Sequence, residues 1–406
     1  MRRAEPPVCI KSVGKTRVGV MTKGNLGAIC LLTLCVMFLA GLWPFHSPRN
    51  KVSWLSHSNG LLFGKYGSIA SAGVLKANPL QAESSCGLEI WLEPKLVDGE
   101  GTVLGFYWPD SGIVPFAIRQ YRSGLELEKS SRDAKSATVV YVDKVFSHRG
   151  PVLVTITSSR SGTTIYADGA MLRKFAHFGL SIQDFTGRLV VGNSPVVAFD
   201  WIGQVRGLAI YDRELTADEA SQHFANWTRN ERPIIAGTEG PGGLYLFNER
   251  QGNVVHNQVD SRTDLLIPER FFVLQQRFLE RPWDEFRPGW RYWKNIGVNI
   301  VGFIPLGFFF CAYFSSSQNS NRAVAKTIAL GFIVSLTIEV LQAFLPTRDS
   351  GMTDLVTNTL GTALGVVVFR YNSFHAILAH VAPSLSSAHG QSADGSRRRL
   401  VNSARR

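Results

Sequence analysis

Four long apolar runs constrain this chain more than any other feature of its sequence. They lie at residues 26–45, 296–314, 327–345 and 355–369. A run of about 20 apolar residues is long enough to cross the hydrocarbon core of a bilayer as a helix. The sequence therefore predicts a membrane protein with four transmembrane helices, one near the N-terminus and three near the C-terminus.

The first of these helices is expected at residues 26–45, after a basic tail at 1–25. A cleaved signal peptide is the alternative interpretation of such an N-terminal run. The charged lead-in is long, and no clean small-x-small cleavage site follows the run. These two features favour an uncleaved membrane anchor.

The C-terminal apolar runs predict a transmembrane region at 294–371, with helices near 293–314, 324–345 and 351–370. The last helix carries polar residues in its first half, and a soluble helix is the alternative there. The tail at 381–406 is rich in Ser, Ala and Arg, a composition that favours disorder.

Charge supplies the expected topology. The formal net charge is +12, but much of the excess of basic residues sits in the two tails, which favours lipid contacts and topology signals over nucleic acid. Six Lys or Arg residues precede the first helix, and Arg322 and Lys326 lie between the second and third. Arginines ahead of the second helix argue for the opposite orientation. Because the first helix usually dominates, we expect both tails in the cytoplasm and the middle domain outside the cytoplasmic membrane.

Residues 265–293 are expected to form an amphipathic interfacial segment. Phe271, Leu274 and Phe278 fall at helical spacing, and aromatic residues follow among arginines: Trp283, Trp290, Tyr292 and Trp293. This pattern is typical of an amphipathic helix and an aromatic belt at the membrane surface. A linker helix packed on the middle domain is the alternative.

The middle of the chain, residues 51–260, reads as many short strands separated by turns. Hydrophobic residues alternate at 88–92, 152–156, 164–167 and 205–210, and Asp168-Gly169 is a hairpin signal. Regular short strands of this kind predict an all-β sandwich or barrel. The domain contains a single cysteine, Cys86, so it holds no internal disulfide, and no metal-ligand spacing occurs in the chain.

One stretch of this domain resembles a known fold. The segment 199–219 contains Phe-Asp-Trp-Ile-Gly, then an alternating strand that ends at Tyr211, then Leu215 and an acidic pair. The Gly-Arg-Leu-Val-Val-Gly-Asn segment at 187–193 precedes it, and 244–247 supplies a late strand. Together they resemble the closing strands of laminin-G-like, concanavalin A-like jelly rolls.

The resemblance implies binding of carbohydrate or protein. The hydrolase branch of these jelly rolls carries an ExDxxE string, which is missing here, so we expect a non-catalytic domain. Many relatives bind calcium, but the sequence alone does not single out its oxygen ligands. Four aromatic residues are candidates for stacking on sugar rings, although core packing is the more frequent role of such residues: Trp91, Tyr107, Trp108 and Trp201.

The C-terminal helices carry the strongest chemical signal, because polar residues recur in otherwise apolar segments. The second helix contributes an Asn pair four residues apart, hence on one face, and a Phe-Ile-Pro-Leu-Gly stretch follows. The third contributes Glu-x-x-Gln, the next loop Arg-Asp, and the last helix Asp-x-x-x-Asn-x-x-Gly and a GxxxG. These residues are Asn295, Asn299, Glu339, Gln342, Arg348, Asp349, Asp354, Asn358, Gly361 and Gly365.

This ordered set resembles the VanZ family, with a large jelly roll inserted after the first helix. The family's namesake is tied to teicoplanin resistance, so the resemblance implies a role at the cell envelope without naming a reaction. Gly361 and Gly365 are expected to allow close helix packing; a chance match is the alternative.

Geometry suggests how the polar residues are arranged. Asn299, Glu339 and Asn358 lie six or seven residues from the outer ends of their helices, about 10 Å deep at 1.5 Å per residue. We expect a polar pocket with Arg348 and Asp354 at its mouth, where Glu339 accepts a proton or contacts a ligand. Interhelical hydrogen bonds are the competing interpretation, and an all-oxygen metal site is a minor one.

Two classes of function follow. The first is a non-enzymatic envelope protein whose jelly roll binds glycan or protein, with the lipid bilayer as its other partner. The second is a membrane enzyme or transporter that acts on an envelope lipid or polysaccharide intermediate at the Glu339 pocket. No HExxH, GxSxG or Walker loop is present, which favours the first class, and no cofactor is predicted.

Overall fold

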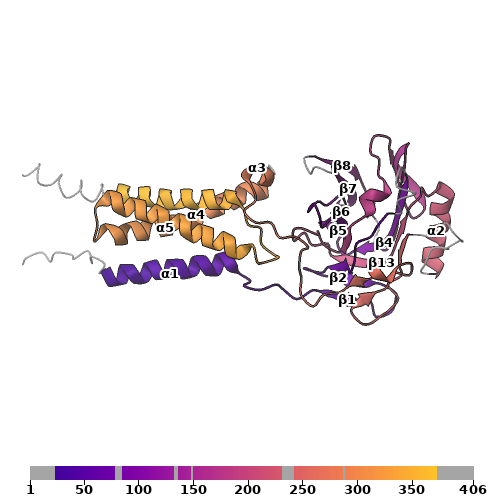
Figure 1. Cartoon of the computed structure of the whole chain (residues 1–406), viewed down its shortest axis with the longest axis horizontal. Coiled ribbons are helices and arrows are strands. Elements are labelled where there is room, and N and C mark those ends of the chain that lie inside the picture. The colour runs from indigo at the N-terminus through magenta and orange to yellow at the C-terminus, as the bar shows by residue number, and fades with distance from the viewer. Residues whose placement is uncertain are drawn as a thin grey trace, which may run out of the picture. The chain divides into compact units, whose positions relative to one another are not determined.

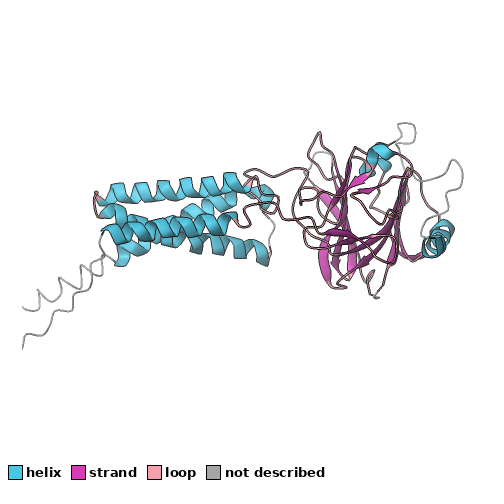
Figure 2. Ribbon diagram, turned by 90° about the horizontal axis from the view of Figure 1, so that it is seen from below, coloured by secondary structure: helices cyan, strands magenta, loops and turns pink. Residues whose placement is uncertain are grey.

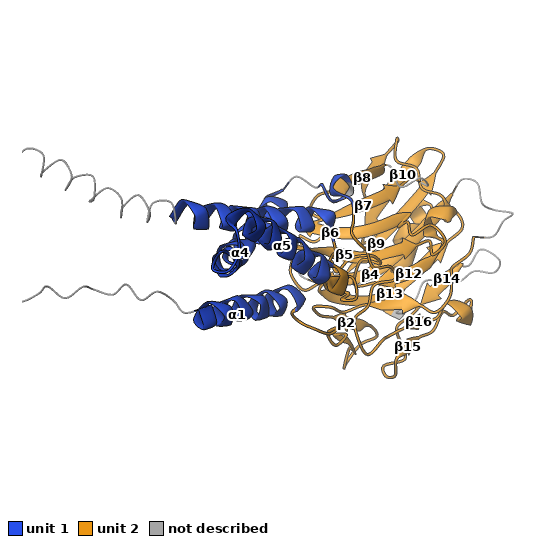
Figure 3. Ribbon diagram, turned by 60° about the vertical axis from the view of Figure 1, so that its left-hand side comes forward, with its two compact units in different colours: residues 1–42, 281–339, 351–406 blue, residues 43–280, 340–350 orange. Residues whose placement is uncertain are grey.

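The computed structural model describes residues 23–77, 85–131, 136–147, 150–230, 242–286 and 289–372. The chain divides into two compact units, which Figure 3 colours separately. The first contains Met1–Leu42, Arg281–Glu339 and Gly351–Arg406, and the second contains Trp43–Glu280 and Val340–Ser350. Residues 1–22 and the tail at 381–406 lie outside the described residues.

Among the described residues, four helices are long and apolar enough to cross a membrane, with mean hydropathies from 1.3 to 2.2. They are α1 Lys23–Leu42, α4 Trp290–Ser315, α5 Ser320–Gln342 and the helix Met352–Asn372. The four predicted transmembrane helices are therefore confirmed as helices of sufficient length and composition. The third ends at Gln342, three residues before the predicted end at residue 345, because the chain turns there through a hydrogen bond from the Leu345 N–H to the Gln342 carbonyl.

The helices of the first unit lie side by side in both views (Figures 1 and 2). Gly27 at the start of α1 contacts Tyr313 near the end of α4, and Gly41 contacts Ile338 near the end of α5. Thus α1 runs antiparallel to α4 and parallel to α5. An apolar cluster fills the space between them: Cys30, Met37, Phe303, Leu306, Phe310, Val334 and Ile338.

The second unit is a sandwich of two antiparallel sheets of eight strands each (Figure 2). One sheet has the order β1 Val52–Trp54, β2 Leu61–Phe63, β13 Gly203–Tyr211, β4 Cys86–Pro94, β9 Val152–Ser159, β10 Gly162–Ala167 and β11 Ala170–Phe175, with β14 Gly243–Tyr245 paired to β13. The other has the order β15 Val254–Val255, β16 Leu265–Leu266, β3 Ile69–Ser71, β12 Arg188–Val191, β5 Gly99–Tyr107, β6 Phe116–Arg122, β7 Gly124–Ser130 and β8 Ala137–Val142.

Local sequence explains the pairing of β10 with β11. Ala167 pairs with Ala170, which leaves Asp168 and Gly169 as a two-residue loop. Both have positive φ, 51° and 77°, and the tight hairpin turn that matches strand twist requires positive φ at both positions. The Asp-Gly hairpin is confirmed, and the predicted jelly-roll sandwich is confirmed with it.

The sandwich core lies between the sheets, where alternate residues of each strand point inward. Leu88, Ile90 and Leu92 of β4 belong to this core, whereas Glu89 and Trp91 face the outer side. A second apolar cluster covers that outer side, formed by β-strand residues together with α2 Ala217–Asn230. Helix α2 lies along the sheet that contains β4 and β13 (Figure 1).

Three features differ from the sequence-based expectation. Helix α2 was not predicted, although Thr216 and Glu219 form a capping box at its start. The prediction of an amphipathic helix around Phe271 and Phe278 is wrong. This segment is not helical, and Phe271 is buried against Tyr66 of the sandwich. The sandwich also continues past residue 260, since β16 and the following chain belong to the second unit.

Candidate functional site

The predicted polar residues of the bundle are hydrogen-bonded between helices. Asn299 of α4 donates its side-chain amide to a carboxylate oxygen of Asp354 in the last helix, at 2.7 Å. Asn358, one turn after Asp354, donates to the hydroxyl of Ser335 in α5 at 3.0 Å. Asn358 is 4% exposed, and its side-chain oxygen has no hydrogen-bond partner among the described residues. The last helix is therefore tied to both neighbours by side chains of the predicted site.

Glu339 is a carboxylate almost completely enclosed by the protein, with 1% exposure. One of its oxygens accepts the backbone N–H of Gly351 at 3.0 Å. Gly351 precedes the last helix and accepts the Leu355 N–H, so the Glu339 carboxylate lies at that helix's N-terminus. The helix dipole and the unpaired N–H groups at this end favour a negative charge.

A second glutamate reaches the same glycine. Glu285 ends the short helix α3 Pro282–Glu285, and its carboxylate lies where any side chain at Gly351 would be placed. A side chain at Gly351 would therefore have to displace the Glu285 carboxylate. Glu285 and Glu339 thus both lie beside the first residues of the last helix.

Small residues let the helices pack closely below this polar layer. A Cβ atom on Gly361 would overlap the backbone of Ile300, and one on Gly365 would overlap the backbone of Ile304. Gly307 of α4 lies in the same way against the backbone of Thr362. The GxxxG pair therefore faces α4 at backbone-to-backbone distance, the arrangement typical of membrane helices with small residues at their interface.

The structure thus brings Asn299, Glu339, Asp354 and Asn358 together within the first unit. Asn295 is exposed on α4. Gln342, Arg348 and Asp349 belong to the second unit, where Arg348 donates both Nε and Nη2 to the backbone carbonyl oxygen of Trp43, at 3.1 and 2.6 Å. Sequence reasoning did not foresee this role for Arg348, because a main-chain acceptor about 300 residues away leaves no local signal.

The two ends of the bundle differ in side-chain chemistry. Basic residues lie at the end formed by the start of α1, the end of α4 and the start of α5: Lys23, Arg322, Lys326 and, on the last helix, Arg370. The opposite end carries exposed aromatic side chains: Trp283, Phe286, Trp290 and Trp293. Arg281 lies over the Trp283 ring at 5.9 Å. Exposed aromatic residues mixed with arginines are typical of the headgroup layer of a bilayer.

A metal site is the minor interpretation of the polar cluster in the bundle. The described residues contain no group of three or more His, Cys, Asp or Glu side chains that could hold a metal ion. Calcium, which many relatives of the jelly roll bind, stays a possibility that the resemblance raises, because backbone carbonyl oxygens and water are calcium ligands as well.

A buried carboxylate that the sequence reasoning missed lies in the sandwich. Glu89 has no exposed surface and accepts hydrogen bonds from Tyr211 at 3.0 Å and from the indole of Trp227 at 3.2 Å. The His223 ring lies 2.9 Å from its other oxygen. Burial, together with the Glu89 charge, raises the pKa of the Tyr211 hydroxyl, which therefore stays a donor. The available signal was an acidic residue inside the apolar strand 88–92.

The aromatic candidates for sugar stacking lie mostly in the interior. Trp91, Tyr107 and Trp201 are 7%, 5% and 1% exposed, which leaves no ring face for a ligand. Trp108 is half-buried and donates its indole N–H to the hydroxyl of Thr186 at 3.0 Å. The core interpretation of these residues is the one that the structure supports.

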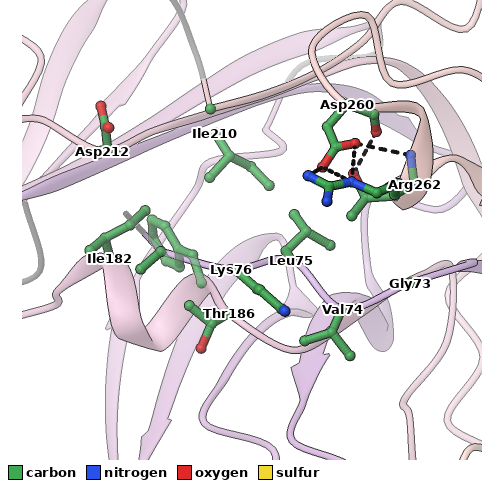
Figure 4. A pocket seen from close by; sticks show the side chains of 14 residues that line it. Gly73, Val74, Leu75, Lys76, Ile182, Thr186, Ile210, Asp212, Asp260 and Arg262 are labelled. Carbon is green, nitrogen blue, oxygen red and sulfur yellow. Dashed lines mark hydrogen bonds and ion pairs between the residues drawn. The ribbon is translucent and has the colours of Figure 1, made fainter. Parts of the chain in front are cut away.

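A pocket of about 520 Å³ opens in the sandwich instead. Its walls come from the chain at 73–77, the 3-10 helix η1 Ile182–Phe185, the end of β13, and the 3-10 helix η3 Ser261–Thr263. Figure 4 shows Lys76, Asp212, Asp260 and Arg262 around it. Its volume lies within the range of about 300–1,000 Å³ that small-molecule sites occupy.

Four apolar helices and an inserted antiparallel sandwich define a multi-pass membrane protein with a β domain between its first and second spans. Residues 243–376 match the model of the VanZ/LLP1 family. The match begins at β14 and includes α4, α5 and the last described helix. The C-terminal part of the chain is therefore a VanZ-like region, and the resemblance predicted from Asn295 to Gly365 is confirmed.

Solved structures resemble the sandwich only distantly. The receptor binding domain of botulinum neurotoxin D is 16% identical over 47% of this chain and 49% of its own, with a TM-score of 0.35. A putative carbohydrate binding protein from Bacteroides ovatus is 14% identical over 52% of this chain and 58% of its own, with a TM-score of 0.37. The alignments thus cover about half of these structures. A search of curated proteins gave no match.

Proposed function

We propose that this chain is a cell-envelope protein of the cytoplasmic membrane that holds its jelly roll outside the cytoplasm to bind a glycan or a protein, with glycan as the preferred ligand. The pocket of about 520 Å³ in the sandwich carries the proposal. It combines charged side chains with an apolar wall, the combination that fixes a polar ligand in one orientation.

The orientation rests on the bundle. Lys23, Arg322 and Lys326 share one end of it, and cytoplasmic flanks of membrane helices carry an excess of Lys and Arg. The aromatic end, with Trp283 and Trp290, then lies at the outer headgroup layer. The sandwich follows α1 and precedes α4 in the chain, and both helices reach this aromatic end.

Two measurements test this function. A single cysteine at Ser161, in the exposed turn between β9 and β10, is placed on a cysteine-free background and labelled in intact, envelope-permeable cells with a membrane-impermeant maleimide. Purified full-length protein in detergent is then tested for retention on isolated cell-wall glycan. Labelling in intact cells with glycan retention supports the function; labelling only after the inner membrane is broken contradicts it.

A second candidate is a membrane enzyme or transporter that acts on an envelope lipid or polysaccharide intermediate. The enclosed Glu339 carboxylate and the unpartnered oxygen of Asn358 favour it, because polar groups inside a membrane bundle often mark a substrate or proton path. It ranks second because interhelical hydrogen bonds already account for much of this cluster. Glu339→Gln keeps an acceptor for Gly351 but removes the charge. Loss of the cellular phenotype at normal membrane levels would favour the second candidate, and an unchanged phenotype would exclude a required charge.

A further inference from the structure

Building on the proposed glycan-binding function, we propose that the pocket bounded by residues 73–76 and 260–263 is a binding site for a saccharide unit that carries a carboxylate. Figure 4 shows that its charged side chains come from different elements. The ligand class follows from three properties of the pocket: a hydrogen-bonded wall, the Lys76 ammonium group, which has no ion pair among the described residues, and an apolar side.

The walls are held by hydrogen bonds that do not depend on a ligand. Leu75 and Gly187 exchange backbone hydrogen bonds at 2.8 and 2.9 Å. The Thr186 hydroxyl accepts from Trp108 and donates to the carbonyl oxygen of Gln183. A site preformed in this way loses little conformational entropy when it binds.

The other side carries the Asp260–Arg262 pair, whose side chains are 35% and 86% exposed. Arg262 places its Nε 2.9 Å from one carboxylate oxygen of Asp260 and its Nη2 3.0 Å from the other. This forked pair lowers the pKa of the Asp260 carboxyl, through the Arg262 hydrogen bonds first. It orients the guanidinium and neutralises its charge, but the Nη1 donors are not part of the pair.

Lys76 supplies the charge that remains for a ligand. Its side chain lies between those of Thr186 and Val74 (Figure 4), and it forms no ion pair with another described residue. Asp212 on the same pocket provides an acceptor for hydroxyl groups. A pocket that holds one ammonium group without an ion pair among the described residues, and also two carboxylates, matches a singly charged carboxylate better than a doubly charged phosphate, which the carboxylates repel.

Apolar side chains complete the match to a sugar. The 40% exposed Val74 lines the pocket together with the buried Ile182, Phe185 and Ile210, and its side chain offers an apolar surface for the C–H face of a pyranose ring. Hydroxyl groups on the ring edge then face Asp212 and the Arg262 donors, while the carboxylate faces Lys76.

Ligand-observed NMR titrations of the full-length protein in detergent micelles test the site. The probes are D-glucuronic acid and D-galacturonic acid, each compared with D-glucose or D-galactose. We expect at least one uronic acid to bind about tenfold more tightly than its neutral counterpart, the size of effect that one charge-assisted hydrogen bond gives. Lys76→Met should remove this advantage. Lys174→Met, on the exposed strand β11 away from the pocket, is the matched control and should keep it.

The outcomes separate this site from the broader function. Equal binding of uronic acid and neutral sugar, or an advantage that survives Lys76→Met, overturns the site. If the protein nevertheless stays on cell-wall glycan, the proposed function stands and only this pocket is rejected. If neither the uronic acids nor the wall glycan bind, both proposals fail.

Discussion

Each region of this molecule encloses a glutamate, and the two regions stabilise it in different ways. In the sandwich, Glu89 accepts hydrogen bonds from side chains of a strand and of α2, among them Tyr211 and Trp227. In the bundle, Glu339 accepts a backbone N–H at the start of a helix. A buried charge must be met by hydrogen bonds because its desolvation is costly.

The difference shows which interactions hold the elements of each region in place. Side chains on the outer face of the sheet are not part of the core between the two sheets. A polar residue on this face can therefore position the whole helix α2. The bundle packs glycines against backbone, with Gly361 facing Ile300 and Gly365 facing Ile304, and leaves little room for long donors. Its polar contacts therefore use helix ends and short side chains such as Asn358 and Ser335.

The largest effect is expected where the bundle packs most closely. Gly361→Leu would force a branched side chain into the backbone of Ile300, and we expect a destabilisation of about 3 kcal/mol or more. The measurement is the level of folded protein in membranes and its thermal stability in detergent. Gly302→Leu is the matched control, because a Cβ atom there meets no other atom within 4 Å. Equal effects of the two substitutions would contradict the close packing.

The next effect tests the side-chain network of the sandwich. Glu89→Ala leaves Tyr211, His223 and Trp227 without their acceptor, and we expect a loss of about 3 kcal/mol, since removal of one partner from a buried polar network exposes the others to desolvation costs. Chemical unfolding followed by tryptophan fluorescence measures it.

Glu93→Ala is the comparison for Glu89. Glu93 lies on the same strand as Glu89, and its substitution removes a partly exposed ion pair with Arg206. Such pairs are worth about 0–1 kcal/mol. A smaller loss for Glu89→Ala than for Glu93→Ala would show that the buried network does not stabilise α2.

The bundle glutamate should be less sensitive than Glu89. Glu339→Ala leaves the Gly351 N–H without this acceptor, and we expect a cost of about 1–2 kcal/mol. Glu339→Gln retains an acceptor oxygen and should cost less than about 1 kcal/mol. Thermal unfolding in detergent compares the two. A collapse of stability in both variants would mean that the charge itself holds the helix start.

The smallest expected effect is a loss of folding stability at low pH. Hydrogen bonds, first from Arg213 and then from Thr216, lower the pKa of Glu219 at the start of α2 from 4.5 to about 2. Because the folded-state pKa is depressed, this stabilisation is complete above about pH 4.5 and is lost as the pH falls toward 2. Unfolding at pH 6 and pH 3 should show a larger acid-induced loss in the wild type than in Glu219→Gln, by less than about 1 kcal/mol. Identical pH profiles would exclude this contribution.

The sequence was informative wherever a pattern is local. Helix length and apolarity predicted the four spans, and Asp168-Gly169 predicted a hairpin. The spacing of Asn299, Glu339 and Asn358 placed them at one depth, and all three make contacts near the start of the last helix.

The remainder depended on distant partners. Phe271 has helical spacing to its neighbours but packs against Tyr66, some 200 residues earlier, so tertiary burial overrode the local period. Arg348 was expected at the mouth of the polar pocket, yet its donors bind the carbonyl oxygen of Trp43. The pocket with Lys76 and Arg262 is assembled from segments far apart in the chain, and no local pattern marks it.

Because the sandwich lies between α1 and α4 in the chain, α1 is synthesised well before the other described spans. While the ribosome makes residues 43–280, α1 is the one span of the four that has entered the bilayer, and its Cys30, Met37 and Gly41 surfaces face lipid until α4 and α5 arrive. The two sheets also stay incomplete until late in synthesis, because β14 completes one and β16 joins the other only after residue 242. If α1 leaves the bilayer during this interval, none of the other three described spans has yet been made to retain the nascent chain. Early membrane retention therefore rests on α1.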